Sequence, residues 1–148
     1  MRRWHPWAFA GLLLFFLTSG ASAERQIALK DLPAVVRASV QREIAGSTLK
    51  RLVKEAEDGK TFYEAETVRA DLGRDLLFDA TGQLVEVEER IAIDAAPAAV
   101  RAALDARGRI LRIERATKGS RITYEALVQK NGKKSEVTVD ERGTPVKR

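Results

Sequence analysis

The chain has 148 residues, of which 32% are charged, and its formal net charge is +5. It contains no cysteine and one histidine, His5, so a disulfide is excluded and the usual zinc, copper and iron sites lack their imidazole and thiolate ligands. Ser-His-Asp and Cys-His catalysis are likewise excluded for the chain beyond that histidine.

Residues 1–23 have the layout of a secretory signal peptide. Arg2 and Arg3 come first, an apolar run of 11 residues follows at 7–17, and Ala21-Ser22-Ala23 supplies small residues for cleavage. The run is too short for a membrane-spanning helix, which needs about 20 apolar residues, and a lipoprotein anchor would need a cysteine. We therefore predict cleavage after Ala23, a periplasmic or secreted protein, and no stable membrane insertion of the mature chain.

The predicted mature chain, residues 24–148, has 125 residues, 24 of them basic and 21 acidic, and thus a net charge of +3. This length fits one compact domain or two very small ones. The small net charge and the predicted export argue against a nucleic-acid partner. Packing alone has to hold the fold together, because no disulfide is available.

Two halves of the mature chain resemble each other. Tyr63-Glu64-Ala65 recurs 61 residues later as Tyr124-Glu125-Ala126, and each copy is followed 14 residues after its alanine by an aspartate, Asp79 or Asp140. Upstream, residues 32–40 match residues 96–104 with an offset of 64, so the second copy is three residues shorter. We predict two tandem units, residues 24–90 and 91–148.

Each unit is expected to begin with a helix. Apolar residues at helical spacing predict a helix over 32–44, with Asp31 as a starting residue, Pro33 early in the helix and Gly46 at its end. The second unit offers Asp94, Pro97 and Gly108 at the matching places, around a helix over 96–104.

Four strands are expected after each helix, separated by turn residues such as Asp58-Gly59 and Asn131-Gly132. In the first unit they are 48–57, 61–68, 74–78 and 83–93, and in the second unit 109–116, 121–129, 134–139 and 144–148. The predicted fold class is α+β: two tandem two-layer units, each a helix on a four-stranded antiparallel sheet, with the sheets continuous or closely packed.

Alternation along the strands indicates which side chains face the helices. We expect Tyr63, Ala65 and Thr67 to face inward with their counterparts Tyr124, Ala126 and Val128. The same side is predicted for Leu76, Phe78, Val85, Val87, Val137 and Val139. The opposite face should then carry Glu64, Glu66, Glu86, Glu88 and Glu125.

The stretch from Leu32 to Glu89, with its Leu-Pro helix start, Tyr-Glu pair and Asp-x-x-Gly turn, resembles the PepSY-like domain, which is related to beta-lactamase-inhibitor-like repeats. The resemblance implies a small antiparallel sheet with helical cover in an exported bacterial protein. It also implies a non-catalytic binding or inhibitory module. The second copy departs from this pattern in its Ala-Ala-Pro start, its three missing residues near Arg109 and Pro145 in its last strand.

The candidate binding residues are four carboxylates on the face without a helix: Glu64, Glu66, Glu86 and Glu88. Carboxylates on neighbouring strands could bind a basic partner or a divalent cation such as calcium, which prefers several oxygen ligands. An ordinary solvated sheet face is the alternative. The stretches "DATGQ" and "DERGT" are interpreted as hairpin turns, since they lack the run of ligands that a calcium loop needs.

A binding function follows from these observations. A glycosidase-type carboxylate pair is disfavoured because the mature chain has four aromatic residues, most of them expected in the core. We predict a non-catalytic protein, without a cofactor, that engages another exported or envelope protein through a sheet face or a strand edge; one form of this is inhibition of a peptidase or hydrolase. The alternative is a protein that binds a divalent cation or an anionic envelope surface through charged residues, including the basic stretches 129–134 and 145–148. Free sheet edges also leave the oligomeric state open.

Overall fold

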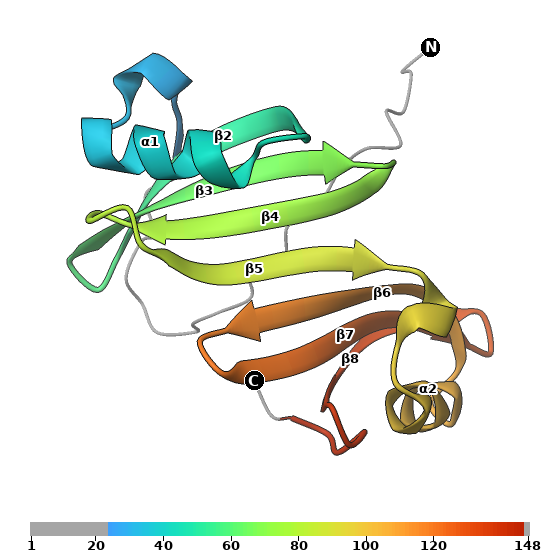
Figure 1. Cartoon of the computed structure of the whole chain (residues 1–148). Coiled ribbons are helices and arrows are strands. Elements are labelled where there is room, and N and C mark those ends of the chain that lie inside the picture. The colour runs from blue at the N-terminus through green and yellow to red at the C-terminus, as the bar shows by residue number, and fades with distance from the viewer. Residues whose placement is uncertain (1–23, 147–148) are drawn as a thin grey trace, which may run out of the picture.

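The computed structural model describes residues 24–146, which form one antiparallel sheet and two α-helices (Figure 1). The predicted signal peptide lies outside the described residues. The eight strands lie side by side in the order of the sequence. They are β1 (Arg25–Gln26), β2 (Thr48–Glu57), β3 (Lys60–Arg69), β4 (Leu72–Asp79), β5 (Leu84–Ile91), β6 (Arg109–Lys118), β7 (Arg121–Lys130) and β8 (Lys133–Asp140). The helices are α1 (Ala34–Glu43) and α2 (Ala98–Asp105), each preceded by a short 3-10 turn, Leu29–Asp31 or Ile93–Ala95.

Proline sets the start of both helices. Pro33 and Pro97 stand immediately before the first helical residue, with φ of −51° and −53°, where the missing N–H leaves no hydrogen bond unmade. The prediction that Asp31 and Asp94 start the helices is wrong, because both lie in the 3-10 turns. Asp31 instead accepts a hydrogen bond from the N–H of Ala28 at 3.2 Å.

Both helices cover the same face of the sheet. Val87 and Ile91 are four residues apart on β5 and so point to the same side; Val87 packs against the core beneath α1, and Ile91 packs against the core beneath α2. The core beneath α1 contains Leu32, Val36, Val40, Leu52, Tyr63, Ala65, Leu76 and Phe78. The core beneath α2 contains Ala96, Val100, Leu104, Ile110, Ile113, Tyr124, Ala126, Val128 and Val139.

The inward face predicted from alternation is confirmed in β3 and β7. Tyr63, Ala65, Tyr124, Ala126 and Val128 are all buried in the two cores. Thr67, also predicted inward, is buried, and its hydroxyl donates a hydrogen bond to the carbonyl oxygen of Arg74 at 2.7 Å.

The inward assignment of Val85 is wrong, because a β-bulge interrupts β5. Leu77 lies opposite Glu86, whereas the next residue on β4, Phe78, lies opposite Leu84. The bulge reverses the alternation at this point. As a result Leu84 packs against the core beneath α1 in the place that strict alternation assigns to Val85.

One sheet runs through the whole described chain. β5 and β6 pair antiparallel from Glu86 opposite Lys118 to Ile91 opposite Ile113, so the two predicted halves are joined edge to edge. The three-residue difference between them falls in and after the helices: α1 has 10 residues and α2 has 8, and the links to the next strand are 44–47 and 106–108. A continuous sheet, one of the two arrangements expected, is therefore present.

The ends of the sheet differ from the prediction. The expected last strand at 144–148 is reduced, within the described residues, to an isolated bridge between Pro145 and Val139, because proline has no N–H to continue a ladder. At the other end, β1 was not predicted; it pairs with β2 through Arg25 opposite Lys54 and Gln26 opposite Val53.

The predicted hairpin turns after β4 and β8 are confirmed. Asp79 Oδ1 accepts hydrogen bonds from the N–H groups of Thr81 and Gln83 at 2.9 and 3.0 Å. Asp140 Oδ1 does the same for Arg142 and Thr144 at 2.9 and 2.8 Å. The pKa of Asp79 is lowered mainly by a hydrogen bond from the Thr81 hydroxyl, and that of Asp140 mainly by the N–H of Thr144. The backbone hydrogen bonds of the two turns correspond at an offset of 61.

Candidate functional site

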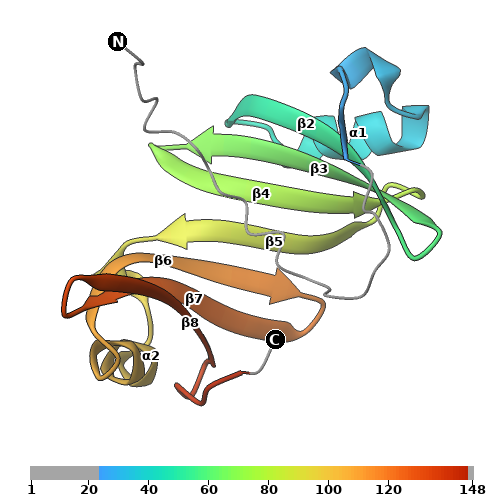
Figure 2. The same cartoon turned by 180° about the vertical axis from the view of Figure 1, so that it is seen from behind.

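The face of the sheet opposite the helices carries no helix in the part of the chain that the structure describes (Figure 2). Alternation along the strands directs many charged side chains to this face. Strand pairing places them in rows that run across the sheet. We call this surface the acidic face and define it by Glu64, Glu66, Asp75, Glu86, Glu88, Glu114 and Glu125.

The four predicted binding residues all lie on the acidic face, but not side by side. Glu64 and Glu66 are on β3, and Glu86 and Glu88 are on β5, with β4 between these two strands. Because adjacent strands are about 5 Å apart, the two pairs are roughly 10 Å apart across the sheet. The expectation of direct neighbours on adjacent strands is therefore wrong for these four residues.

Asp75 on β4 fills the gap between the two pairs. It lies opposite Glu66 on one side and opposite Glu88 on the other, so three carboxylates stand in one row on three adjacent strands. Arg51 on β2 ends the row, with its Nε atom 3.1 Å from Glu66 Oε1. Sequence reasoning missed Asp75, although it lies one residue before the buried Leu76 and so points to the opposite face by simple alternation.

This row is electrostatically unfavourable when it is fully ionised. Burial, followed by the charges of Glu66 and Glu114, raises the pKa of Asp75 to about 7. Burial, followed by the charges of Glu86 and Glu114, raises the pKa of Glu88 to about 7. Among the described residues, Asp75 Oδ1 is buried without a hydrogen-bond partner. Like charges placed directly opposite each other destabilise a sheet.

Glu64 takes part in a second group of carboxylates at the edge of this row. Burial, followed by the charge of Glu55 on β2, raises the pKa of Glu64 to about 8. Burial also raises the pKa of Glu55, which is 5% exposed. The proton that each of these groups holds more tightly removes part of the repulsion near neutral pH.

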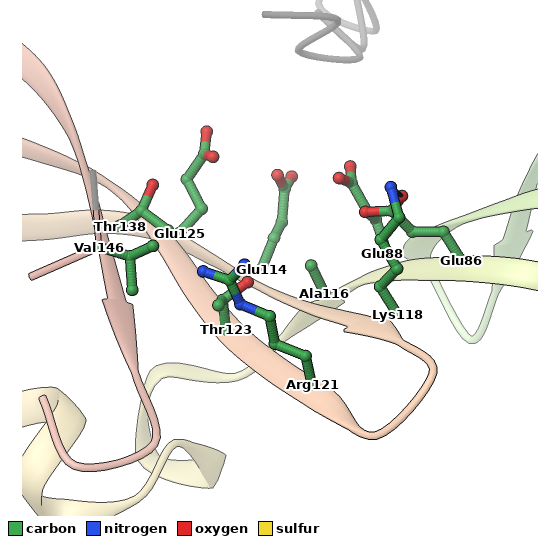
Figure 3. A pocket seen from close by; sticks show the side chains of 10 residues that line it. All are labelled: Glu86, Glu88, Glu114, Ala116, Lys118, Arg121, Thr123, Glu125, Thr138 and Val146. Carbon is green, nitrogen blue, oxygen red and sulfur yellow. Dashed lines mark ion pairs between the residues drawn. The ribbon is translucent and has the colours of Figure 1, made fainter. Parts of the chain in front are cut away.

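A groove opens on the part of the acidic face formed by β5 to β8. It has a volume of about 260 Å³ and is lined by Glu86, Glu88, Glu114, Ala116, Lys118, Arg121, Thr123, Glu125, Thr138 and Val146 (Figure 3). The short side chains of Ala116 and Thr123 form its floor. The carboxylates of Glu88, Glu114 and Glu125 all rise from the same side of the sheet around them.

Basic side chains also lie in and beside the groove, and Arg121 is part of its lining. Lys118 Nζ lies 3.2 Å from Glu86 Oε2, and Arg112 Nε lies 3.2 Å from Glu114 Oε1. The exposed Lys118 can swing away, because a surface ion pair of this kind contributes at most about 1 kcal/mol. The groove lining contains four carboxylates, Glu86, Glu88, Glu114 and Glu125, and two cations, Lys118 and Arg121, so the lining is acidic on balance.

Within residues 24–146, no group of three or more acidic, histidine or cysteine side chains is placed to hold a metal ion. In the same part of the chain, no helix is long and apolar enough to cross a membrane. The carboxylates of the acidic face lie on successive strands from β3 to β7.

No family model matches this chain, and no curated protein matches it. Several solved structures share its architecture. A protein from Bacteroides eggerthii, provisionally described as periplasmic, has a TM-score of 0.63 at 15% identity over 78% of this chain and 86% of its own. A DUF2874 family protein from Bacteroides ovatus has a TM-score of 0.60 at 14% identity over 78% and 85%.

A BLIP-like protein from Bacteroides fragilis has a TM-score of 0.58 at 15% identity, covering 78% of this chain and 84% of that protein. None of these three proteins is described as an enzyme. At such identities the likeness concerns the fold, and it extends over most of both chains. This chain therefore has the fold found in DUF2874 and BLIP-like proteins: one eight-stranded antiparallel sheet with two helices.

Proposed function

We propose that this protein is a non-catalytic, exported binding protein that engages another exported or envelope protein through its acidic face. The observation that carries the proposal is the row of Glu66, Asp75 and Glu88 on three adjacent strands. A partner with lysine or arginine side chains would neutralise this row. The repulsion among the carboxylates in the free protein would then be replaced by attraction between the carboxylates and the partner's cations.

The shape of the surface supports a protein as the partner. The acidic face crosses β3 to β7. The groove, in which four carboxylates outnumber Lys118 and Arg121, offers a place for one long basic side chain. Interfaces of this kind are anchored by a few side chains in pockets, often arginine, within a larger polar surround.

Inhibition of a peptidase or hydrolase is the specific form of binding that we propose. Its support is the fold shared with a protein described as BLIP-like, together with the resemblance of the sequence to PepSY-like and beta-lactamase-inhibitor-like repeats. We further infer that the sheet is built from two copies of one unit, residues 24–90 and 91–148. The matching turns at Asp79 and Asp140 and the matching helix starts at Pro33 and Pro97 support this inference.

The test is capture of the partner from the native envelope fraction by cross-linking, with three baits in parallel. They are the wild-type protein from residue 24 onward, the acidic-face variant Glu86→Lys/Glu88→Lys, and the control variant Asp105→Lys/Glu141→Lys. The control changes the net charge by the same amount, at exposed sites away from the acidic face. We expect one partner to be captured by the wild type and the control and lost by the acidic-face variant.

Circular dichroism on each bait establishes that the variants are folded. The milder variant Asp75→Asn/Glu88→Gln, which removes charge without adding bulk, should weaken binding in the same direction. A partner captured equally by all baits would contradict binding through the acidic face. Capture of nothing, together with a rise in melting temperature on calcium addition or flotation with anionic vesicles, would favour the cation- or envelope-surface alternative.

A further inference from the structure

The two outermost strands of the sheet, β8 and β1, correspond to β4 and to the end of β5, which pair with each other inside the sheet. Inside the sheet, β4 and β5 pair antiparallel, with Arg74 opposite Glu89 and Phe78 opposite Leu84. In the repeated pattern of the sequence, β8 is the counterpart of β4, and β1 is the counterpart of the end of β5. The sheet order puts β1 and β8 at opposite ends, so one chain cannot bring these two strands together.

β8 corresponds to β4 at an offset of 61. The bridge between Val139 and Pro145 is the counterpart of the pair Phe78 and Leu84 at the same offset. Val146 adds one more hydrogen bond, from its N–H to the carbonyl oxygen of Thr138 at 3.0 Å. At the start of β8, residues 133–135 are exposed. In the described part of the chain, no strand pairs with them on the side away from β7.

β1 corresponds to the end of β5 at an offset of 64. Arg25 opposite Lys54 repeats Glu89 opposite Arg115, and Gln26 opposite Val53 repeats Arg90 opposite Glu114. A 3-10 turn and an α-helix follow β1, as they follow β5. β5, however, has β4 on its other side, whereas β1 is the first strand in the sheet order and is exposed.

We propose that β8 of one copy pairs antiparallel with β1 of a second copy, in the register of β4 and β5. This register places Ser135 of one copy opposite Arg25 of the next and Lys134 opposite Gln26. Because α1 and α2 cover the same face, the helices of successive copies would also lie on one face, and the acidic face would continue from copy to copy. A contact between two different edges repeats head to tail and gives open chains, or a ring where the rotation between copies closes.

The association is expected to be weak and dependent on concentration. β1 is two residues long, and the matching edge of β8 carries Lys133 and Lys134, which discourage indiscriminate edge pairing. Specificity then comes from register and from the residues opposite each other, since edge pairing by backbone hydrogen bonds needs few special side chains. The inference concerns copies of this chain alone and does not depend on the proposed binding partner.

The register makes cysteine cross-linking a direct test, because the natural chain has no cysteine. Two exported variants, Gln26→Cys and Lys134→Cys, are incubated with a short bismaleimide, separately and mixed. We expect a cross-linked dimer in the mixture and none in either variant alone. Labelling of both cysteines with a monofunctional maleimide shows that each is reactive, so that a negative result is informative.

A charge-swap series then tests the pair formed by Ser135 and Arg25. Ser135→Glu puts a carboxylate opposite Arg25 and should raise the yield of cross-linked dimer several-fold, whereas Ser135→Arg should lower it. Adding Arg25→Glu to Ser135→Arg should restore the yield. Both positions are exposed, so folding is not at risk.

Three results would overturn the proposal. Cross-linking of Lys134→Cys with itself would show pairing of β8 with β8 about a twofold axis. Cross-linking of the mixture that is insensitive to the charge at Ser135 would show a different register. A chain that sediments as a monomer up to millimolar concentration, with no cross-link in the mixture, would show that the two edges do not meet.

Discussion

Gly143, in the turn after β8, lies directly against the carbonyl oxygen of Ala99 in α2: a β-carbon at Gly143 would stand 2.6 Å from that oxygen and 2.9 Å from the Ala103 β-carbon. The first half has the same relationship, since a β-carbon at Gly82 would lie 3.0 Å from the carbonyl oxygen of Val35 in α1. In each case, the turn that an aspartate organises is therefore in close contact with the covering helix.

Gly143→Ala should destabilise the protein by about 3 kcal/mol. Gly143 has φ of +80°, and an added β-carbon would both strain the backbone, at roughly 1–2 kcal/mol, and collide with α2. Gly132→Ala is the matched control, because Gly132 has φ of +76° and nothing within 4 Å of the added β-carbon. Urea denaturation should show the control losing about 1–2 kcal/mol. Equal losses for the two variants would contradict the close packing of Gly143 on α2.

Stability should fall as the pH rises towards 8. The folded protein raises the pKa of Asp75 and Glu88 to about 7 and that of Glu64 to about 8, above the ordinary values of 3.8 and 4.5. A carboxyl group with a raised pKa holds its proton better in the folded state, so its contribution is fully present below the ordinary value and is lost as the pH rises through the folded value. Denaturation at intervals between about pH 4.5 and 8.5 should show a loss above about 1 kcal/mol. A flat profile over this interval would contradict the burial of these groups.

Asp75→Asn should stabilise the protein at pH 8 by at least about 1 kcal/mol and flatten the profile just described. The amide removes a buried charge from between Glu66 and Glu88 without changing the size of the side chain. Asp71→Asn, an exposed change at the turn before β4, serves as the control and should leave the pH dependence as it is. If Asp75→Asn lowers stability at pH 8, then Asp75 makes a stabilising contact that the described residues do not provide.

Arg69→Ala should destabilise the protein by about 1 kcal/mol. The guanidinium of Arg69 donates hydrogen bonds to the carbonyl oxygen of Ala45 at 2.7 Å and to the hydroxyl of Ser47 at 3.0 Å, which ties β3 to the link after α1. Lys130 occupies the same place in β7 at an offset of 61, and Lys130→Ala should change stability by less than about 0.5 kcal/mol. Thermal unfolding compares the two variants, and equal effects would mean that the hydrogen bonds of Arg69 contribute nothing.

Periodicity and turn residues were enough to predict the strands that form the middle of the sheet and the side chains that lie beneath the helices. Tyr63, Ala65, Tyr124 and Ala126 follow strict alternation, and burial on one face enforces that pattern. Strict alternation failed at Val85, because a bulge adds one residue to a strand and leaves no reliable mark in a single sequence. The two-residue β1 could not be predicted from the sequence, because so short a strand shows no alternation. It is defined by its pairing with β2.

The sequence predicted which carboxylates face away from the helices, but not how they are arranged across the strands. The outward direction of Glu64, Glu66, Glu86 and Glu88 followed from alternation, but their separation depends on which strands are neighbours, and β4 places Asp75 between the two pairs. Likewise, the groove depends on Ala116 and Thr123 lying beside each other on β6 and β7. Neither residue is conspicuous in the sequence, because a hollow is formed by short side chains among long ones.

The most direct test of the central claim is the affinity of the captured partner for the purified protein, measured by calorimetry at low and at high salt. The wild type and Asp105→Lys/Glu141→Lys should bind alike, Glu86→Lys/Glu88→Lys should bind at least ten-fold more weakly, about 1.4 kcal/mol, and salt should weaken the wild-type complex. Equal affinities for all three proteins, or binding that is insensitive to salt, would contradict the acidic face as the binding surface.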